Sequence, residues 1–232
     1  MEGFQGGWVF GRALTRTFLS HGHCGPMFRP ANKARGTYLP PHGFMGTEGA
    51  MGVNWNEGMM RWAPHVDAAG RVYPLTHLHP FRYELPISDQ RRVEIRVAFA
   101  MHCFTRARAG SGGHSQLYKD ERETRCFCPG RYALSPRLPT IARELATRRC
   151  GYAKNENYVT VDVPVTEGKT ALYGVFFNVL RVKDSAGPAV LLTIQSAYEL
   201  ALSRQLSMRG SIKFTRLVEL TLQGVKPRPP RS

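Results

Sequence analysis

The sequence predicts an α+β fold, with a mainly antiparallel sheet of about five strands and one principal helix, near residues 138–149, packed on it. The first observation behind this prediction is that most segments alternate apolar and polar residues, a period of two that is typical of half-buried strands. The second is that only one segment has clear helical spacing. Because parallel strands need long crossover connections, usually helices, the strands should pair mainly antiparallel.

The clearest strand pattern covers residues 92–105. Every second residue from Val93 to Cys103 is apolar, while Glu94, Arg96 and His102 have the opposite parity. Successive side chains of a strand point to opposite faces, so one face should join the core. The other face should present a charge pair and a histidine beside small residues, which leaves room for a binding partner.

The segments on either side of this strand are predicted to be irregular. Residues 73–83 contain two prolines, which bar a central strand and indicate an extended edge segment or a loop. Residues 106–125 are polar and contain the glycine-rich run 110–113, which indicates a long mobile loop. Loops of that length in a compact domain are often functional.

The principal helix is predicted from the spacing of its apolar residues. Positions i, i+3, i+4, i+7 and i+8 share one stripe of a helix, and here they are Leu138, Ile141, Ala142, Leu145 and Ala146. Pro139 fits the first turn, where a missing N–H costs nothing. Arg148 and Arg149 would lie in the last turn, and Gly151 would stop the helix.

The C-terminal third is predicted to consist of strands. Alternation and β-forming residues mark the segments 158–165, 171–182, 189–197 and 213–223. Residues 184–188, Asp-Ser-Ala-Gly-Pro, have strong turn chemistry, so the second and third of these strands should form a hairpin. In the last segment, the residues expected to face inward are Phe214, Val218, Leu220 and Leu222.

The chain is expected to divide into three parts. Residues 1–70 hold 13 of the 23 glycines, 6 of the 8 methionines and all three tryptophans, and no period persists there, so we expect an irregular extension. An alternative is a start codon placed too early, with translation beginning at Met45, Met51, Met59 or Met60. Residues 71–225 should form a single α+β domain. Residues 226–232, with prolines and basic residues, should be a disordered basic tail.

The net charge of +15 is the strongest functional signal. Residues 91–154 hold 14 Lys or Arg against 5 Asp or Glu and are interleaved with aromatic residues. Cations beside aromatic rings suit single-stranded nucleic acid, because phosphates meet Arg while bases stack on rings. We therefore expect a nucleic-acid-binding protein that prefers RNA or single strands to duplex DNA and needs no cofactor. The candidate contact residues are Arg82, Arg96, Arg106, Arg108, Arg125, Arg131 and Tyr132.

One alternative function is metal-independent RNA cleavage centred on His102. Such a reaction needs a base for the 2′-OH proton, an acid for the leaving 5′-oxygen and a cation for the phosphorane. His102 is the natural proton carrier, Arg131 could neutralise the phosphate, and His79 or Tyr198 could be the second proton carrier. Small basic α+β ribonucleases, including toxins of toxin–antitoxin pairs, offer a fold-level analogy only. Whether the protein is an enzyme stays open at this point.

Two further alternatives are a protein-binding role and a metal site. A basic face could meet an acidic protein, which would make this chain a structural or interaction protein. A zinc site could use Cys126, Cys128, Cys150 and His102, although structural zinc sites usually space paired cysteines by two to four residues. Buried or incidental thiols are the simpler interpretation of these cysteines, and no metal is expected.

Several familiar signatures are absent from the sequence. It contains no phosphate-binding P-loop, dinucleotide fingerprint, nucleophile elbow or His-Glu-x-x-His motif, which disfavours NTPases, dehydrogenases, α/β-hydrolases and zinc proteases. The acidic residues Asp120, Glu121 and Glu123 lie in the predicted loop and are expected to be solvated. The odd number of cysteines and the lack of a secretory or membrane-length apolar run favour a cytoplasmic location and no membrane role.

Overall fold

A computed structural model describes eight stretches of the chain, all within one compact unit of residues 39–232: residues 52–53, 61–108, 116–120, 123–153, 157–166, 169–183, 187–200 and 210–227. Of the expected extension over residues 1–70, residues 1–51 and 54–60 lie outside the described residues, and so do the glycine run 110–113, the turn residues 184–186 and residues 228–232 of the expected tail.

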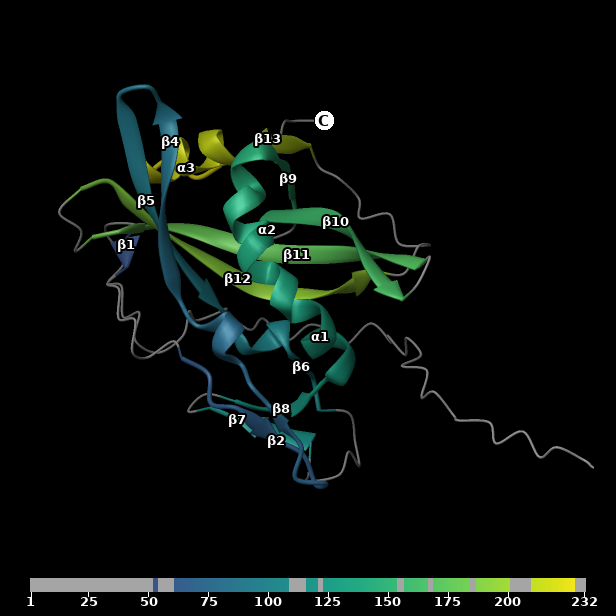
Figure 1. The fold of residues 1–232 in the computed structure, drawn as a ribbon. Helices are drawn as coiled ribbons and strands as arrows, with labels where there is room; N and C mark the ends of the chain where they lie inside the picture. The colour runs from purple at the N-terminus through teal and green to yellow at the C-terminus, as the bar shows by residue number, and fades with distance from the viewer. Residues whose placement is uncertain are drawn as a thin grey trace, which may run out of the picture. The chain divides into compact units, whose positions relative to one another are not determined.

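The largest sheet has eight strands: seven follow the order β13-β9-β10-β11-β12-β5-β4, and the short β1 pairs with β11 off this order (Figure 1). Its strands are β1 (Gly52–Val53), β4 (Phe81–Ser88), β5 (Arg91–Phe99), β9 (Arg149–Tyr152), β10 (Asn157–Thr166), β11 (Lys169–Val182), β12 (Ala189–Leu200) and β13 (Ser211–Lys213). The predicted count of about five strands was therefore wrong. Strands β9 and β13 are too short to show a period, and β4 contains a proline.

The prediction of mainly antiparallel pairing is confirmed, although two pairs of this sheet are parallel, the short β1 with β11 and β5 with β12. Strands β11 and β12 form the hairpin that the turn chemistry predicted, and β4 and β5 form a second hairpin that was not predicted. Strands β5 and β12, however, run parallel, with Val97 opposite Leu192. Pro86 lies on β4, which is the terminal strand of the order, so its missing N–H interrupts only an edge.

The principal helical segment consists of α1 (Pro129–Leu134), a 3-10 turn (Ser135–Arg137), α2 (Leu138–Glu144) and a second 3-10 turn (Leu145–Thr147). In Figure 1 it runs across the strands β10, β11 and β12. The predicted apolar stripe is buried at Leu138, Ile141, Ala142 and Leu145. The predicted C-terminal end was wrong: Arg148 already has an extended backbone and Arg149 begins β9.

The last predicted strand was wrong over most of its length, because Phe214–Leu222 forms the helix α3. Phe214, Leu217 and Val218 are buried, and they stand at the i, i+3, i+4 spacing of a helix face. Gly224 has φ +73° and closes the helix: its N–H donates to the Thr221 carbonyl at 3.1 Å, and the Val225 N–H donates to the Leu220 carbonyl at 2.9 Å. This is the hydrogen-bond pattern of a Schellman motif.

Two small sheets lie in the part of the chain that was predicted to be irregular. One pairs β2 (His65–Val66) with β3 (Val72–Tyr73), and the other has the order β6-β8-β7, from Thr105–Arg106, Thr124–Phe127 and Leu117–Lys119. The prediction of an unbroken loop over residues 106–125 was therefore wrong at these strands. Aromatic rings hold the region together, since Trp62 contacts both Phe104 and Tyr118 edge-on.

The hydrophobic core lies between the main sheet and its helices. Val93, Ile95, Val97 and Phe99 of β5 all belong to it, which confirms the inward parity predicted for this strand. A smaller cluster, formed by Ala98, Val182, Ala189 and Leu191, covers part of the opposite face of the same sheet. The face predicted to be polar is therefore partly buried near β5.

Candidate functional site

The backbone around His102 leaves the sheet and forms a tight turn. The predicted strand ends at Phe99, and Met101–Cys103 forms a 3-10 turn. Met101 and Cys103 are buried at 2% and 0% exposure, whereas the side chain of His102 keeps 36% exposure. His102 thus has the outward direction that its parity predicted, but it stands on a turn rather than on a strand.

His102 forms a close pair with Glu123. The Nε2 atom of His102 lies 2.7 Å from Oε1 of Glu123. The other carboxylate oxygen of Glu123 accepts a hydrogen bond of 3.2 Å from Arg125, whose Nε donates to the Thr105 hydroxyl at 2.9 Å. The backbone N–H of Glu123 donates to a carboxylate oxygen of Asp120, which fixes the local turn. Both oxygens of Glu123 are therefore engaged, one by an imidazole and one by a guanidinium.

Arg131 holds the His102 turn from the helical side. It stands on α1, and one of its terminal nitrogens donates to the backbone carbonyls of His102 and Thr105, each at 2.8 Å. Its guanidinium carbon also lies 4.9 Å from the ring centroid of Tyr198 on β12. Arg131 therefore joins α1, the turn and the main sheet at one point. We name His102, Thr105, Glu123, Arg125, Arg131 and Tyr198 the His102 cluster.

Burial sets the protonation state of His102. It lowers the pKa of His102 below the ordinary histidine value of 6.5, and the hydrogen bond to Glu123 opposes this only in part. The imidazole is then mostly neutral at neutral pH. A neutral imidazole beside a carboxylate donates through Nε2–H, which leaves Nδ1 as an acceptor. This is the tautomer that a general base requires.

The predicted arginines occupy three kinds of environment. Arg106 and Arg108 are exposed and follow Thr105 of the His102 cluster by one and three residues in the chain. Arg125 and Arg131 are largely covered within it. On the β4–β5 hairpin, Arg96 is buried at 7% exposure and pairs with Glu94 at 3.0 Å, while the more exposed Arg82 reaches the same carboxylate at 3.4 Å.

His79 and Tyr132 were predicted as site residues, but among the described residues no contact joins either of them to His102. His79 places its Nε2 atom 3.3 Å from the carbonyl oxygen of Trp62. Tyr132 is half-buried among aromatic rings, and its hydroxyl donates to the Pro74 carbonyl at 3.3 Å. The structure therefore brings together His102, Arg125, Arg131 and Tyr198 out of the predicted set.

The alternative metal set of Cys126, Cys128, Cys150 and His102 is not gathered. Among the described residues, no group of three or more His, Cys, Asp or Glu side chains is placed to hold a metal ion. Burial raises the pKa of Cys150 to about 12, so this thiol stays protonated. Cys103 is equally buried, and its Sγ lies 3.5 Å from the Ile194 carbonyl oxygen.

The sequence interpretation missed Glu123 and Thr105. Glu123 stands one residue before β8, and its contact with His102 spans 21 positions of the chain. The sequence Thr124–Phe127 shows no alternation that would mark a strand, and no local pattern pairs this segment with His102. Thr105 is 0% exposed and links Arg125 to the turn through its hydroxyl.

The fold and the site together define a mixed α+β protein, mostly sheet, with a histidine–carboxylate–arginine cluster beside one edge of its helical layer. Residues 65–222 match the model of the YjaZ family, and this range includes every member of the His102 cluster. The chain therefore belongs to the YjaZ family. Comparisons with curated proteins and with solved structures gave no match. None of the helices in the described residues has both the length and the apolar character needed to cross a membrane.

Proposed function

We propose that this protein binds nucleic acid, and RNA or single strands in preference to duplex DNA. The observation that carries the proposal is the strong positive charge, +15 overall, together with the exposed Arg106 and Arg108 beside a half-exposed histidine. Cations around a polar site attract the phosphate backbone, and binding releases counterions from it.

We propose different roles for the individual arginines. Arg106 and Arg108 are exposed and would contact phosphates directly. Lys119 is also exposed and lies on the same face of the small sheet as Arg106. Arg106 is opposite Cys126 of β8 and Lys119 is opposite Thr124, and residues two apart on a strand share a face. Arg96 and Arg131 are proposed to support the structure, because the first is buried against Glu94 and the second donates to two backbone carbonyls.

Paired charge-neutralising variants test this assignment. Arg106→Gln combined with Arg108→Gln should weaken binding to a single-stranded RNA in fluorescence anisotropy by about tenfold or more, because each lost phosphate contact removes part of the salt-dependent affinity. The matched control is Arg148→Gln with Arg216→Gln, which removes the same charge from arginines paired with Glu144 and Glu219. Equal loss in both double variants would show that only bulk charge matters.

A second candidate function is RNA cleavage without a metal, and the His102–Glu123 contact of 2.7 Å favours it. Neutral His102 would take the 2′-OH proton, the 2′-oxygen would bond to phosphorus, and the bond to the 5′-oxygen would break to leave a 2′,3′-cyclic phosphate. Tyr198 is the proton donor proposed for the leaving 5′-oxygen. Arg125, which touches Glu123, would offset charge on the phosphorane.

Cleavage assays in the presence of EDTA separate this candidate from simple binding. Wild-type protein should cut single-stranded RNA, His102→Ala should not, and both should bind an uncleavable RNA with 2′-deoxy sugars equally well. Tyr198→Phe, which keeps the ring against Arg131 but removes the hydroxyl, should also slow cleavage. Binding without cleavage in the wild-type protein would remove the enzymatic candidate and leave the binding proposal intact.

The third candidate function is binding to an acidic protein. Such a partner is a polyanion like RNA, but it carries carboxylates in place of phosphates and has no bases. An acidic polypeptide that displaces RNA at equal charge concentration would favour it, whereas selective retention of RNA would not. We also propose a cytoplasmic location for this protein. Free thiols at Cys103, Cys126, Cys128 and Cys150 fit a reducing compartment.

A further inference from the structure

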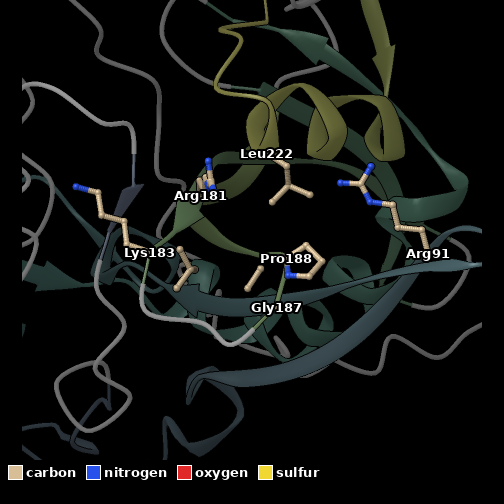
Figure 2. Close-up of a pocket in the computed structure, with 8 residues that line it drawn as sticks. Arg91, Arg181, Lys183, Gly187, Pro188 and Leu222 are labelled. Atoms are coloured by element: carbon tan, nitrogen blue, oxygen red, sulfur yellow. The ribbon is translucent and has the colours of Figure 1, made fainter.

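A pocket of about 350 Å³ lies between the start of β5, the end of β11, the start of β12 and the end of α3 (Figure 2). Arg91, Arg181 and Lys183 supply its charged lining, and Pro188 and Leu222 supply apolar lining. Its size is at the lower end of small-molecule pockets, which span roughly 300–1,000 Å³. None of these residues belonged to the predicted site.

The three cations of this pocket have no carboxylate partner among the residues that the structure describes. Arg91, Arg181 and Lys183 are all exposed, and no ion pair in the described part of the chain includes them. By contrast, the adjacent Arg92 lies 3.8 Å from Glu84. Like charges brought together without counterions repel one another, so the pocket favours an anion.

The arrangement of the lining suggests a two-part ligand. Figure 2 shows Arg91 and Arg181 on either side of Leu222, with Pro188 facing Leu222, while the amine of Lys183 points away from this centre. Guanidinium groups bind phosphate oxygens in a bidentate way, which an ammonium cannot do. The apolar centre between the two arginines would accept a ring or another apolar moiety.

An uncapped helix C-terminus would repel an anion, but the C-terminal end of α3 is capped. The last carbonyls of a helix carry partial negative charge. Here the carbonyls of Glu219, Leu220 and Thr221 accept backbone hydrogen bonds of 2.9–3.1 Å from residues 223–225. These acceptors are therefore occupied by the C-terminal cap.

We propose that this pocket binds a nucleotide, with the ring portion in the apolar centre against Leu222 and Pro188 and the phosphate group paired with the flanking guanidinium groups of Arg91 and Arg181. The phosphate could come from a free mononucleotide or from a unit of a nucleic-acid strand, and the recognition chemistry is the same. The inference is separate from the proposed function, because the pocket shares no residue with the His102 cluster.

Calorimetric titration of the full chain with AMP, adenosine and inorganic phosphate tests the pocket. AMP should bind and adenosine should not. Arg91→Gln and Arg181→Gln should each raise the Kd for AMP by about tenfold or more, since a charge-assisted hydrogen bond contributes about 1.5–3 kcal/mol. The matched control Arg92→Gln removes the same charge from the neighbouring residue outside the pocket and should change the Kd by less than about twofold.

Competition with a short single-stranded RNA identifies the source of the phosphate. Displacement of AMP by RNA that is lost with Arg91→Gln would show that a strand uses the pocket, and AMP binding without competition would show a free nucleotide site. The inference is overturned if neither AMP nor phosphate binds at millimolar concentration, or if Arg92→Gln weakens AMP as much as Arg91→Gln does. Because the RNA affinity of the wild-type protein is measured separately, loss of the pocket would not be mistaken for loss of RNA binding.

Discussion

The imidazole of His65 shows how one residue can couple this fold to pH. It is 4% exposed, stacks on Phe127 with centroids 4.1 Å apart, and its Nε2 atom has no hydrogen-bond partner among the described atoms. Burial lowers the pKa of His65 below 6.5, with Asp67 opposing the shift. As the pH falls, His65 therefore binds a proton more readily in the unfolded chain than in the folded chain. The contribution of His65 to the free energy of unfolding is therefore complete above pH 6.5, its ordinary pKa, and is lost as the pH falls below that value.

Replacing this imidazole by an apolar ring should remove that loss. His65→Phe should stabilise the fold by about 1 kcal/mol at neutral pH, because an unpartnered polar atom leaves the interior. The gain should grow as the pH falls through 6.5. Urea unfolding between neutral and mildly acidic pH measures both effects, with Val66→Ala as a neighbouring exposed control. Parallel pH profiles for the wild type and His65→Phe would contradict this account.

The protonation of His102 can be read directly by NMR. Its pKa should lie below 6.5 in the wild type, because burial outweighs the carboxylate. Glu123→Gln should lower the pKa of His102 further, since it removes the charge that favours the imidazolium. Histidine ring titration provides the measurement. A wild-type pKa above 6.5 would be incompatible with burial as the dominant cause. An upward shift in Glu123→Gln would contradict the part assigned to the carboxylate.

At the residue scale, the sequence predicted which face a side chain lies on better than it predicted which residues that side chain contacts. His102, Arg131 and Tyr198 were chosen from parity and chemistry, and the fold brings them together. Arg96 was expected on an open face, but that face is partly covered near β5 by the cluster of Ala98 and its neighbours. Its burial depends on strands that are distant in sequence, and no local pattern reports it.

At the scale of single elements, α3 shows a conflict between two periods. Phe214, Val218 and Leu222 fit both alternation and a helical face. Leu217 decides the matter, because it is buried in the helix but would point outward in a strand. The glycine at position 224 and the Arg216–Glu219 pair, three residues apart at 3.0 Å, are helical signals that the alternation obscured.

The C-terminal cap of α3 gives a direct test of this helix. Gly224→Ala should destabilise the protein by about 1 kcal/mol or more, because alanine is strained at φ +73°. Gly130→Ala is the matched control: it lies on α1, has no positive φ, and an added methyl would meet nothing within 4 Å. Thermal unfolding compares the two. Equal melting temperatures for both variants would argue against the assigned cap.

The short strand β9 depends on a second glycine. A methyl at Gly151 would lie 2.5 Å from the ring of Tyr158, its partner on β10. Gly151→Ala should therefore cost about 1–3 kcal/mol through overpacking. Adding Tyr158→Leu should recover part of that loss, and the double-mutant cycle measures the coupling. Strict additivity would show that the two side chains do not meet.

At the scale of the whole molecule, the class of fold was predictable and the strand order was not. Alternation located β5, β10, β11 and β12, and the single apolar stripe located α2. The parallel pairing of β5 with β12 joins segments about a hundred residues apart, so it depends on long-range contacts that no local period encodes. The strands β9 and β13 are likewise recognisable only once they pair with each other.

The charge of the whole molecule is the property on which the functional account depends. It predicts that the affinity for a single-stranded RNA, measured by fluorescence anisotropy, falls linearly on a log–log plot against salt, with a slope of about −2 or steeper, as three or more phosphate contacts require. Duplex DNA of equal length should bind more weakly at every salt concentration. A flat salt dependence, or no binding at roughly 50 mM salt, would contradict nucleic-acid binding as the function of this protein.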